Sequence, residues 1–292
     1  MEDTVNSLVD YSDEWRVIML DRMGFKEDPF SVSADPRYLY LGTEHLGVYR
    51  QLQGVVTRRR GLAMLTGGMG MGKSSLARRL MQIYYEKDNI ELAFIDTGSF
   101  KTPMSAAQTI SSAFPNFNIG PQRSYDRQME ELKHAIIDAN ERGKNVVLLL
   151  DDAQRMTRDA LEAIHELYNF DYNEKLIQVL LFGQSELRPL VNSYPAVRER
   201  MFFALELFPM VIESAYKMVE YRVRTAGREQ FLIDIDAFTI LYEVSRGIPR
   251  RIVQLCALGT DILMEKNTTF ITKEIIQEII NRAKRTGILE YE

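Results

Sequence analysis

Hydrophobic positions along the chain alternate between short apolar runs and helical repeats from about residue 62 onward. This order is typical of a parallel β-sheet whose strands are connected by helices on its faces. Apolar runs of strand length predict strands at residues 62–66, 91–97, 145–151, 176–183 and 201–208. Between the third and fourth runs, apolar residues recur at the i, i+3, i+4, i+7 spacing of a helix, at Ala160, Ala163, Ile164 and Leu167.

After Pro209 the hydrophobic positions follow helical spacing alone. We expect four helices there: one with an apolar stripe at Ile212, Tyr216, Val219 and Val223, one capped by Asp236, one beginning at Pro249, and one around Ile275, Ile276, Ile279 and Ile280. The patterns predict an acidic N-terminal segment over residues 1–30, an α/β domain over 31–208, an all-helical domain over 209–285 and a short tail over 286–292.

Charge is distributed unevenly along the chain. The net charge is −5, and residues 1–30 account for all of it with eight acidic and three basic residues. The remainder is balanced, so local basic patches are possible there. Part of the acidic segment, "EWRVIMLDRM", fits an amphipathic helix with Trp15, Ile18, Met19 and Arg22 on one side. Such a helix would dock on a partner or pack on its own domain.

The composition excludes several classes of protein. No apolar run approaches the ~18 residues of a membrane span, and the acidic N-terminus is unlike a basic signal peptide. The sequence therefore predicts a cytoplasmic protein without a membrane segment. Its single cysteine, Cys256, lies in a helical pattern typical of a core residue, and three scattered histidines give no metal-binding cluster.

The most specific motif follows the first predicted strand. Residues 67–74 match the phosphate-binding pattern G-x-x-x-x-G-K-S/T, between an apolar strand and a helix. Glycines in such a loop let backbone N–H groups converge on an anion at a helix N-terminus. The predicted nucleotide-binding residues are Gly67, Gly68, Met69, Gly70, Met71, Gly72, Lys73, Ser74 and Ser75. Lys73 is expected to reach the β- and γ-phosphates of ATP, and the Ser74 hydroxyl to bind Mg²⁺.

Two adjacent carboxylates end the third predicted strand, in "VVLLLDDAQRM". An ionised group at the end of an apolar strand is costly unless another charge compensates it. Beside a phosphate loop, Asp151 would hold Mg²⁺ and Asp152 would be the base that orients an attacking water. The alternative is a pair of aspartates that caps the next helix.

With these motifs the chain resembles the AAA+ ATPases of the ExeA and TnsC/TniB type, from "GFKEDPFSVSADPRYLY" to "TKEIIQEII". The resemblance implies a P-loop AAA+ domain, with a parallel five-stranded sheet between helices, followed by a small helical lid. In "LIQVLLFGQSELRPLV" it nominates Gln184 as the sensor of the γ-phosphate. In "YPAVRERMFFALEL" it nominates Arg198 or Arg200 as the arginine finger that reaches a neighbouring subunit.

Further positions follow from the same resemblance. "GIPRRIVQLC" resembles the lid's second sensor motif, which nominates Arg250, with Arg251 in reserve, and "EDPF" would place Pro29 and Phe30 at the adenine. The family usually has Asp followed by Glu where this chain has Asp151 and Asp152. Because aspartate is shorter by about 1.5 Å, we expect slow hydrolysis that depends on assembly.

The resemblance implies three functions. The first is a regulator of DNA transposition: a homo-oligomer, as a ring or helical filament, that binds duplex DNA and recruits a transposase with a target-selection protein. The second is an ExeA-like secretion-assembly ATPase; such proteins typically continue into a membrane segment, and this chain is expected to end after the lid. The third is a nucleotide-locked scaffold with negligible hydrolysis. A small-molecule phosphoryl transferase is the least expected function, because it would need neither the arginine motif nor the lid.

Duplex binding without sequence readout requires cationic and hydroxyl groups that contact phosphates. The candidates are Lys101 and Thr102 in "TGSFKTPMSA", and Arg123 and Arg127 in "GPQRSYDRQ". For each one, ordinary solvated surface is the alternative. An assembly would multiply weak contacts, so the modest charge of one chain does not exclude DNA binding.

Overall fold

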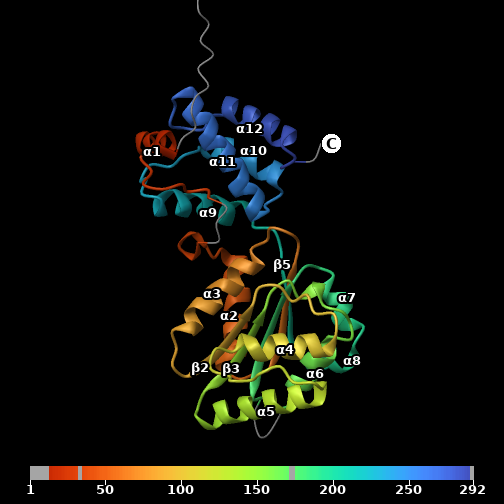
Figure 1. The fold of residues 1–292 in the computed structure, drawn as a ribbon. Coiled ribbons are helices and arrows are strands. Elements are labelled where there is room, and N and C mark those ends of the chain that lie inside the picture. The colour runs from red at the N-terminus through yellow and green to blue at the C-terminus, as the bar shows by residue number, and fades with distance from the viewer. Residues whose placement is uncertain (1–12, 32–34, 171–174, 290–292) are drawn as a thin grey trace, which may run out of the picture. The chain divides into compact units, whose positions relative to one another are not determined.

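The computed structural model describes residues 13–31, 35–170 and 175–289. The chain divides into two compact units (Figure 1). The α/β unit is Thr43–Phe208, and the helical unit combines the described residues of Met1–Gly42 with those of Pro209–Glu292.

The α/β unit is built on one parallel sheet. Its strands are β1 (Leu62–Gly67), β2 (Ile90–Ile95), β3 (Asn145–Leu150), β4 (Ile177–Gly183) and β5 (Met201–Leu207). They lie in the order β2-β3-β4-β1-β5, and every neighbouring pair is parallel. The five predicted strands and the parallel sheet are confirmed. Because β4 lies between β1 and β3, the carboxyl ends of these three strands form one continuous edge.

Helices cover both faces of this sheet (Figure 1). One face packs against α4 (Pro103–Ala113), α5 (Tyr125–Glu141) and α6 (Leu161–Tyr168), and the other against α2 (Thr43–Thr57) and α3 (Lys73–Tyr85). Every residue of β1, β3 and β4 is buried. Strands covered on both faces read as continuous apolar runs, which is why the sequence pattern identified them. The shorter elements of the unit are η2 (Ala153–Arg155), α7 (Leu187–Asn192) and α8 (Pro195–Arg198).

The helical unit contains the four helices expected after Pro209. They are α9 (Ile212–Thr225), α10 (Ile235–Ser245), α11 (Pro249–Lys266) and α12 (Lys273–Arg285). Pro249 is the first residue of α11, as predicted. The predicted cap of α10 is wrong: the Asp234 carboxylate accepts the Ala237 N–H at 2.6 Å, and Asp236 lies one residue inside the helix.

The N-terminal part of the chain belongs to the helical unit. It contributes α1 (Asp13–Arg22) and the short helix η1 (Pro36–Tyr38). Phe30 and Tyr38 lie in the apolar core of this unit, so the described residues from 31 to 42 pack with the helices and not with the α/β domain predicted to begin at residue 31.

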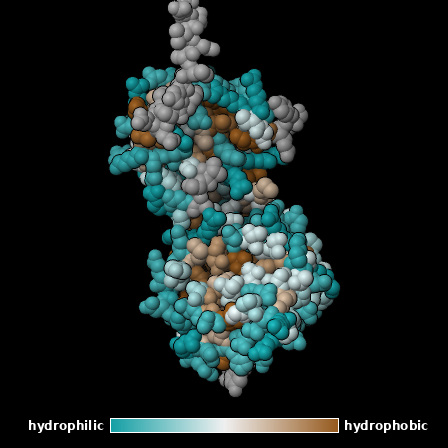
Figure 2. Space-filling model, in the orientation of Figure 1, coloured by the Kyte–Doolittle hydropathy of each residue, from teal (hydrophilic) through white to brown (hydrophobic). Residues whose placement is uncertain are grey.

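The face of α1 also differs from the amphipathic pattern. Met19, Leu20 and Met23 are buried in the core of the helical unit, whereas Ile18 is exposed. The side chain of Trp15 lies outside the described residues. The helix therefore packs on its own unit, with a buried face one position away from the predicted one. Hydrophilic residues cover most of the visible surface of each unit, and apolar residues gather near the middle of the α/β unit's visible face (Figure 2).

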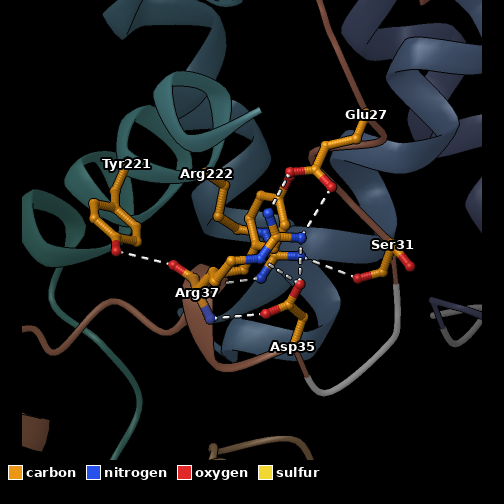
Figure 3. A network of polar contacts seen from close by, with 7 residues as sticks. Glu27, Ser31, Asp35, Arg37, Tyr221 and Arg222 are labelled. Atoms are coloured by element: carbon orange, nitrogen blue, oxygen red, sulfur yellow. Dashed lines mark hydrogen bonds and ion pairs between the residues drawn. The ribbon is translucent and has the colours of Figure 1, made fainter. Parts of the chain in front are cut away.

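A buried guanidinium ties the N-terminal segment to α9 (Figure 3). Arg222 is 9% exposed, and its Nε donates to Pro29 O at 2.8 Å. Its Nη2 and Nη1 donate to Ser31 O and Tyr38 O at 3.0 and 3.4 Å. Burial lowers the pKa of Arg222, because the charged form loses solvation. Backbone carbonyls supply the compensating acceptors, and the adjacent Tyr221 Oη donates to Arg37 O at 2.9 Å.

We expect Arg222→Met to destabilise the helical unit by about 2–4 kcal/mol, because it leaves carbonyl groups without a donor. Urea unfolding followed by circular dichroism measures the change. Arg224→Met is the matched control on the same helix. Arg224 is exposed and pairs with Glu220 one turn away, so its loss should cost about 0.5 kcal/mol or less. Equal costs for the two variants would contradict the role assigned to Arg222.

Candidate nucleotide-binding site

The phosphate loop connects β1 to α3 at the carboxyl edge of the sheet. Gly72 precedes α3 with φ of 96°, in the left-handed region that side chains rarely adopt. A Cβ on Gly67 would lie 2.9 Å from the backbone oxygen of Leu207 in β5. Both glycines are therefore required by the backbone, and the loop has the strand–loop–helix geometry that binds phosphate at a helix N-terminus.

Lys73 begins α3 and is buried beneath the loop. Its Nζ donates to Gly67 O at 2.9 Å and to Gly68 O at 2.8 Å. The ammonium is therefore held against the loop that would enclose the phosphates. From this position the ammonium group of Lys73 could contact the β- and γ-phosphates of a nucleotide bound in the loop.

The structure brings Ser74 and Asp151 together from opposite sides of β4. Asp151 is 5% exposed, and the Ser74 side chain lies near enough to its carboxylate to lower its pKa. Its Oδ1 also accepts the backbone N–H of Asp152 at 2.9 Å. Burial raises the pKa of Asp151, although the nearby Ser74 side chain, the hydrogen bond from the Asp152 N–H and the charge of Lys73 lower it. The ionised carboxylate therefore lacks full compensation within the chain.

These oxygens fit a magnesium ion. The described residues contain no cluster of three or more acidic, histidine or cysteine ligands. Mg²⁺ with a nucleotide does not need one, because one or two protein oxygens suffice when phosphates and water complete the octahedron. The Ser74 hydroxyl and the buried Asp151 carboxylate would be those protein oxygens.

Asp152 has a different environment from Asp151. Its backbone is left-handed, with φ of 50° and ψ of 34°, and its carboxylate is partly exposed. Its Oδ1 accepts a hydrogen bond from Gln154 Nε2 at 3.2 Å, and Arg155 Nε lies 3.9 Å from its Oδ2. Asp152 precedes η2 without a side-chain cap bond, so the helix-capping alternative is wrong for this residue.

Gln184 follows β4 at the same edge of the sheet and is partly buried. Its backbone N–H donates to Gln154 Oε1 at 3.0 Å. The sheet therefore brings together at one edge the phosphate loop, both aspartates and Gln184, all of which sequence reasoning assigned to nucleotide chemistry.

The two candidate arginine fingers differ clearly in their contacts. Arg200 donates from Nη1 to His165 Nε2 at 2.7 Å and also hydrogen bonds with Asn169 Oδ1. Burial and the Arg200 charge lower the pKa of His165, which favours the neutral ring that can accept this bond. Arg198 ends α8 with 54% of its side chain exposed, and its nearest acidic group is Glu199 at 3.7 Å. Arg198 is thus the more available of the two.

The remaining nucleotide candidates lie in the helical unit. Arg250 is exposed in the first turn of α11, and Arg251 follows it with partial exposure. Phe30 is 1% exposed and forms part of the core of that unit, and Pro29 O accepts the bond from Arg222. Core packing accounts for the burial of Phe30 without a nucleotide, and the adenine contact of Pro29 and Phe30 stays a prediction.

The four DNA candidates are all exposed in the α/β unit. The Thr102 hydroxyl caps α4 by accepting the Ser105 N–H at 3.1 Å, so this residue has a structural role. Lys101 precedes that cap. Arg123 and Arg127 flank Ser124, which caps α5.

Sequence reasoning missed His45 on α2. The ring is 2% exposed, and its Nε2 lies 2.8 Å from Met71 O in the phosphate loop. Burial lowers the pKa of His45, which favours a neutral ring that donates from Nε2. A single histidine on an amphipathic helix, 26 residues before its partner, carries no local signal in the sequence.

Comparison with known proteins agrees with this geometry. Residues 56–191 match the family model described as an AAA domain. The chain is 30% identical over 243 residues to general secretion pathway protein A of Aeromonas hydrophila, an alignment that covers 80% of this chain and 42% of that protein. The chain therefore spans about two fifths of this relative. It carries an AAA domain and is related in sequence to this secretion-pathway protein.

Solved structures show the same fold. The ORC2 protein of Aeropyrum pernix, in complexes with ADPNP and ADP, superposes with a TM-score of 0.66 at 15% identity, covering 88% of this chain and 72% of that one. The RuvB Holliday junction branch migration motor of Thermotoga maritima superposes with a TM-score of 0.58 at 15% identity, covering 85% and 74%. The P-loop AAA+ fold and the helical region after it are confirmed. In the described part of the chain, no helix is both long enough and apolar enough to cross a membrane.

We expect Asp151→Asn to raise the melting temperature of the nucleotide-free protein by about 2–4 °C at pH 7.5, because it removes a buried charge. The folded-state pKa of Asp151 is raised above the ordinary value of an aspartate, so ionisation opposes folding as pH rises. The gain should therefore disappear as pH falls toward 3.8. The same variant should lose most of the thermal stabilisation by Mg²⁺-ATP.

Differential scanning fluorimetry between pH 4 and 8 measures both effects, and Asp152→Asn is the control. The Asp152 carboxylate is 38% exposed, so its replacement should change the nucleotide-free melting temperature less. A melting temperature lower than that of the parent for Asp151→Asn at pH 7.5 would contradict the inference that the Asp151 charge is incompletely compensated.

Proposed function

We propose that this protein is an ATPase whose activity depends on assembly into a homo-oligomer. The observation that carries the proposal is the buried Asp151 carboxylate beside the phosphate loop, in which Lys73 Nζ is held by Gly67 O and Gly68 O and near which Ser74 lies. A hydroxyl, a carboxylate and an ammonium at one strand edge are the groups that hold Mg²⁺ and the phosphates of ATP.

Each residue has a role in this proposal. The loop N–H groups bind the phosphates, and Lys73 stabilises negative charge on the β- and γ-phosphates. Magnesium held by Ser74 and Asp151 would neutralise charge that develops on the phosphate oxygens. Asp152 orients the attacking water and accepts its proton, and Gln184 contacts the γ-phosphate from the end of β4.

The hydrolysis rate should be low in the isolated chain. Asp152 has a shorter side chain than the glutamate usual in the resembling family, and a displacement of about 1 Å at a reacting group can lower the rate roughly 10²-fold. An arginine from a neighbouring subunit can restore about 10³–10⁵. We assign this role to Arg198, because Arg200 is already bound within its own chain. The rate of ATP hydrolysis would then rise when the subunits assemble.

The relative at 30% identity supports a secretion-assembly ATPase as the biological role. In this role nucleotide binding would drive assembly, and hydrolysis would release it. Arg250, Pro29 and Phe30 stay the proposed nucleotide contacts of the helical unit. A cytoplasmic location, where ATP is available, is part of the proposal.

Regulation of DNA transposition is the second candidate. It is favoured by the exposed cations Lys101, Arg123 and Arg127 beside the first turns of α4 and α5, two helices that pack against each other. A ring or filament would repeat these cations along duplex DNA and would present a transposase and a target-selection protein with an ATP-dependent surface. A third role, a nucleotide-locked scaffold, corresponds to hydrolysis too slow to measure.

We expect Arg198→Ala to lower turnover at high protein concentration by about 10²–10³, with ATP affinity unchanged. Asp152→Asn should also retain only a small residual turnover, because it lacks the base. An equimolar mixture should regain roughly a quarter of parental activity, since some boundaries then join an intact Arg198 to an intact Asp152. Phosphate release measures turnover, and Arg200→Ala is the control that should not be complemented in this way. A mixture no more active than its components would exclude Arg198 as a residue that acts across the boundary.

We expect nucleotide-loaded protein to shift a 60-base-pair duplex at low salt if the transposition role is right. A variant with Lys101, Arg123 and Arg127 replaced by glutamine should bind about tenfold or more weakly at the same salt, with ATP turnover in the absence of DNA unchanged. Replacing the exposed Lys217, Arg224 and Lys273 of the helical unit gives a control with the same change in charge. Assembly with ATP alone, and no binding of DNA by the parent, would favour the secretion role.

A further inference from the structure

Gln154 occupies a central position that the proposed mechanism does not use. It lies in η2, directly after the two aspartates that end β3, and its side chain is partly buried. The neighbouring Ala153 and Met156 are buried, and Arg155 N donates back to Asp152 O at 3.0 Å. The backbone that carries Gln154 is therefore fixed against the strand ends.

Both ends of the Gln154 carboxamide are engaged. Oε1 accepts the backbone N–H of Gln184 at 3.0 Å, and Nε2 donates to Asp152 Oδ1 at 3.2 Å. The orientation of the amide is determined by chemistry, because an N–H can bond only to the oxygen and a carboxylate only to the NH₂ group. One side chain therefore joins the candidate base at the end of β3 to the candidate sensor at the end of β4.

The end of β4 leaves room for this contact. A Cβ on Gly183 would lie 2.9 Å from Gln154 Oε1 and 2.8 Å from Leu187 Cδ2, closer than packed atoms approach. The glycine therefore lets the carboxamide approach the strand. A Cβ at this position would displace the Gln154 carboxamide from the end of β4, so Gly183 favours the contact.

Asp152 depends on such a partner more than most aspartates do. Its left-handed backbone gives its side chain a direction that the strand does not determine, and its carboxylate is partly exposed. Arg155 is too distant, at 3.9 Å, to fix the carboxylate by a hydrogen bond. The Gln154 amide is the neutral donor that holds Oδ1 and leaves Oδ2 with only the more distant Arg155 beside it.

We propose that Gln154 is a positioning residue that holds the Asp152 carboxylate for water activation and links it to the γ-phosphate sensor Gln184. The inference rests on the proposed ATPase function. A displacement of Gln184 by the γ-phosphate would be transmitted through one amide to the base. The base would then be correctly placed only when the triphosphate is bound.

Two variants of Gln154 separate the two bonds. Gln154→Leu removes both with little change in size. Gln154→Glu keeps an acceptor for the Gln184 N–H but places a second carboxylate against Asp152. We expect each variant to lower kcat about 10–100-fold, with the KM for ATP and the affinity for fluorescent ADP within about threefold of the parent. Gln53→Leu, at another partly buried glutamine in the α/β unit, is the control and should keep parental turnover.

The Asp152→Asn background shows whether Gln154 acts through Asp152. If it does, Gln154→Leu should not lower the residual turnover of Asp152→Asn any further. A purely structural role predicts instead a lower melting temperature, weaker ADP binding and a Gln154→Glu variant that is less affected than Gln154→Leu.

The outcomes also separate this inference from the proposed function. A parent that releases no more phosphate than Lys73→Ala overturns the ATPase function, and the inference with it. A parent that hydrolyses ATP while both Gln154 variants match it overturns the inference alone. An additive loss in the Asp152→Asn background overturns the link through Asp152.

Discussion

The buried carboxylate of Asp151 constrains the rest of the α/β unit. An ionised group with so little exposure needs donors, and it obtains one from the Asp152 amide, with Ser74 and Lys73 near enough to lower its pKa. Ser74 and Asp151 follow β1 and β3, and β4 lies between these two strands. The sheet order and the parallel registers on each side of β4 bring their ends to the same level. The negative charge of Asp151 is incompletely compensated within the chain. The site would therefore favour a cation, such as the Mg²⁺ that accompanies ATP.

The same edge gives the two aspartates different environments. Asp151 is buried near the helix that follows the phosphate loop, as the proposed metal ligand would need to be, whereas the Asp152 carboxylate is partly exposed on a left-handed turn and contacts only flexible side chains. The bend at Asp152 is what separates two carboxylates that are adjacent in sequence. It costs roughly 1 kcal/mol or more, and such strain is typical of functional positions. His45 and Gln154 support this arrangement from α2 and η2, so the loop and the base are each held by one neutral polar side chain.

Most of the sheet could be predicted from the sequence because its central strands are buried on both faces and read as continuous apolar runs. The phosphate loop and the acidic pair could be predicted because their chemistry is local in sequence. The attachment of the N-terminal segment could not, since the Arg222 bonds to Pro29 and Ser31 join residues more than 190 positions apart. The predicted N-cap of α10 is wrong by two residues. Asp234 and Asp236 are equally good capping residues in the sequence, and only the structure shows that the helix begins at Ile235, directly after Asp234. His45 and Gln154 had no motif, because an ordinary polar residue becomes a positioning residue only through the fold.

The attachment by Arg222 has a consequence for nucleotide sensing. It places the adenine candidates Pro29 and Phe30 in the same packed unit as Arg250, while the phosphate loop and both aspartates belong to the other unit. A ligand shifts a conformational equilibrium only by the difference in its affinity for the two states. A ligand that contacts Pro29 or Phe30 would therefore favour the state in which Arg222 holds the N-terminal segment to α9. Since Arg250 belongs to the same packed unit, Arg222 joins the segment that carries the two adenine candidates to the helices that carry this third candidate.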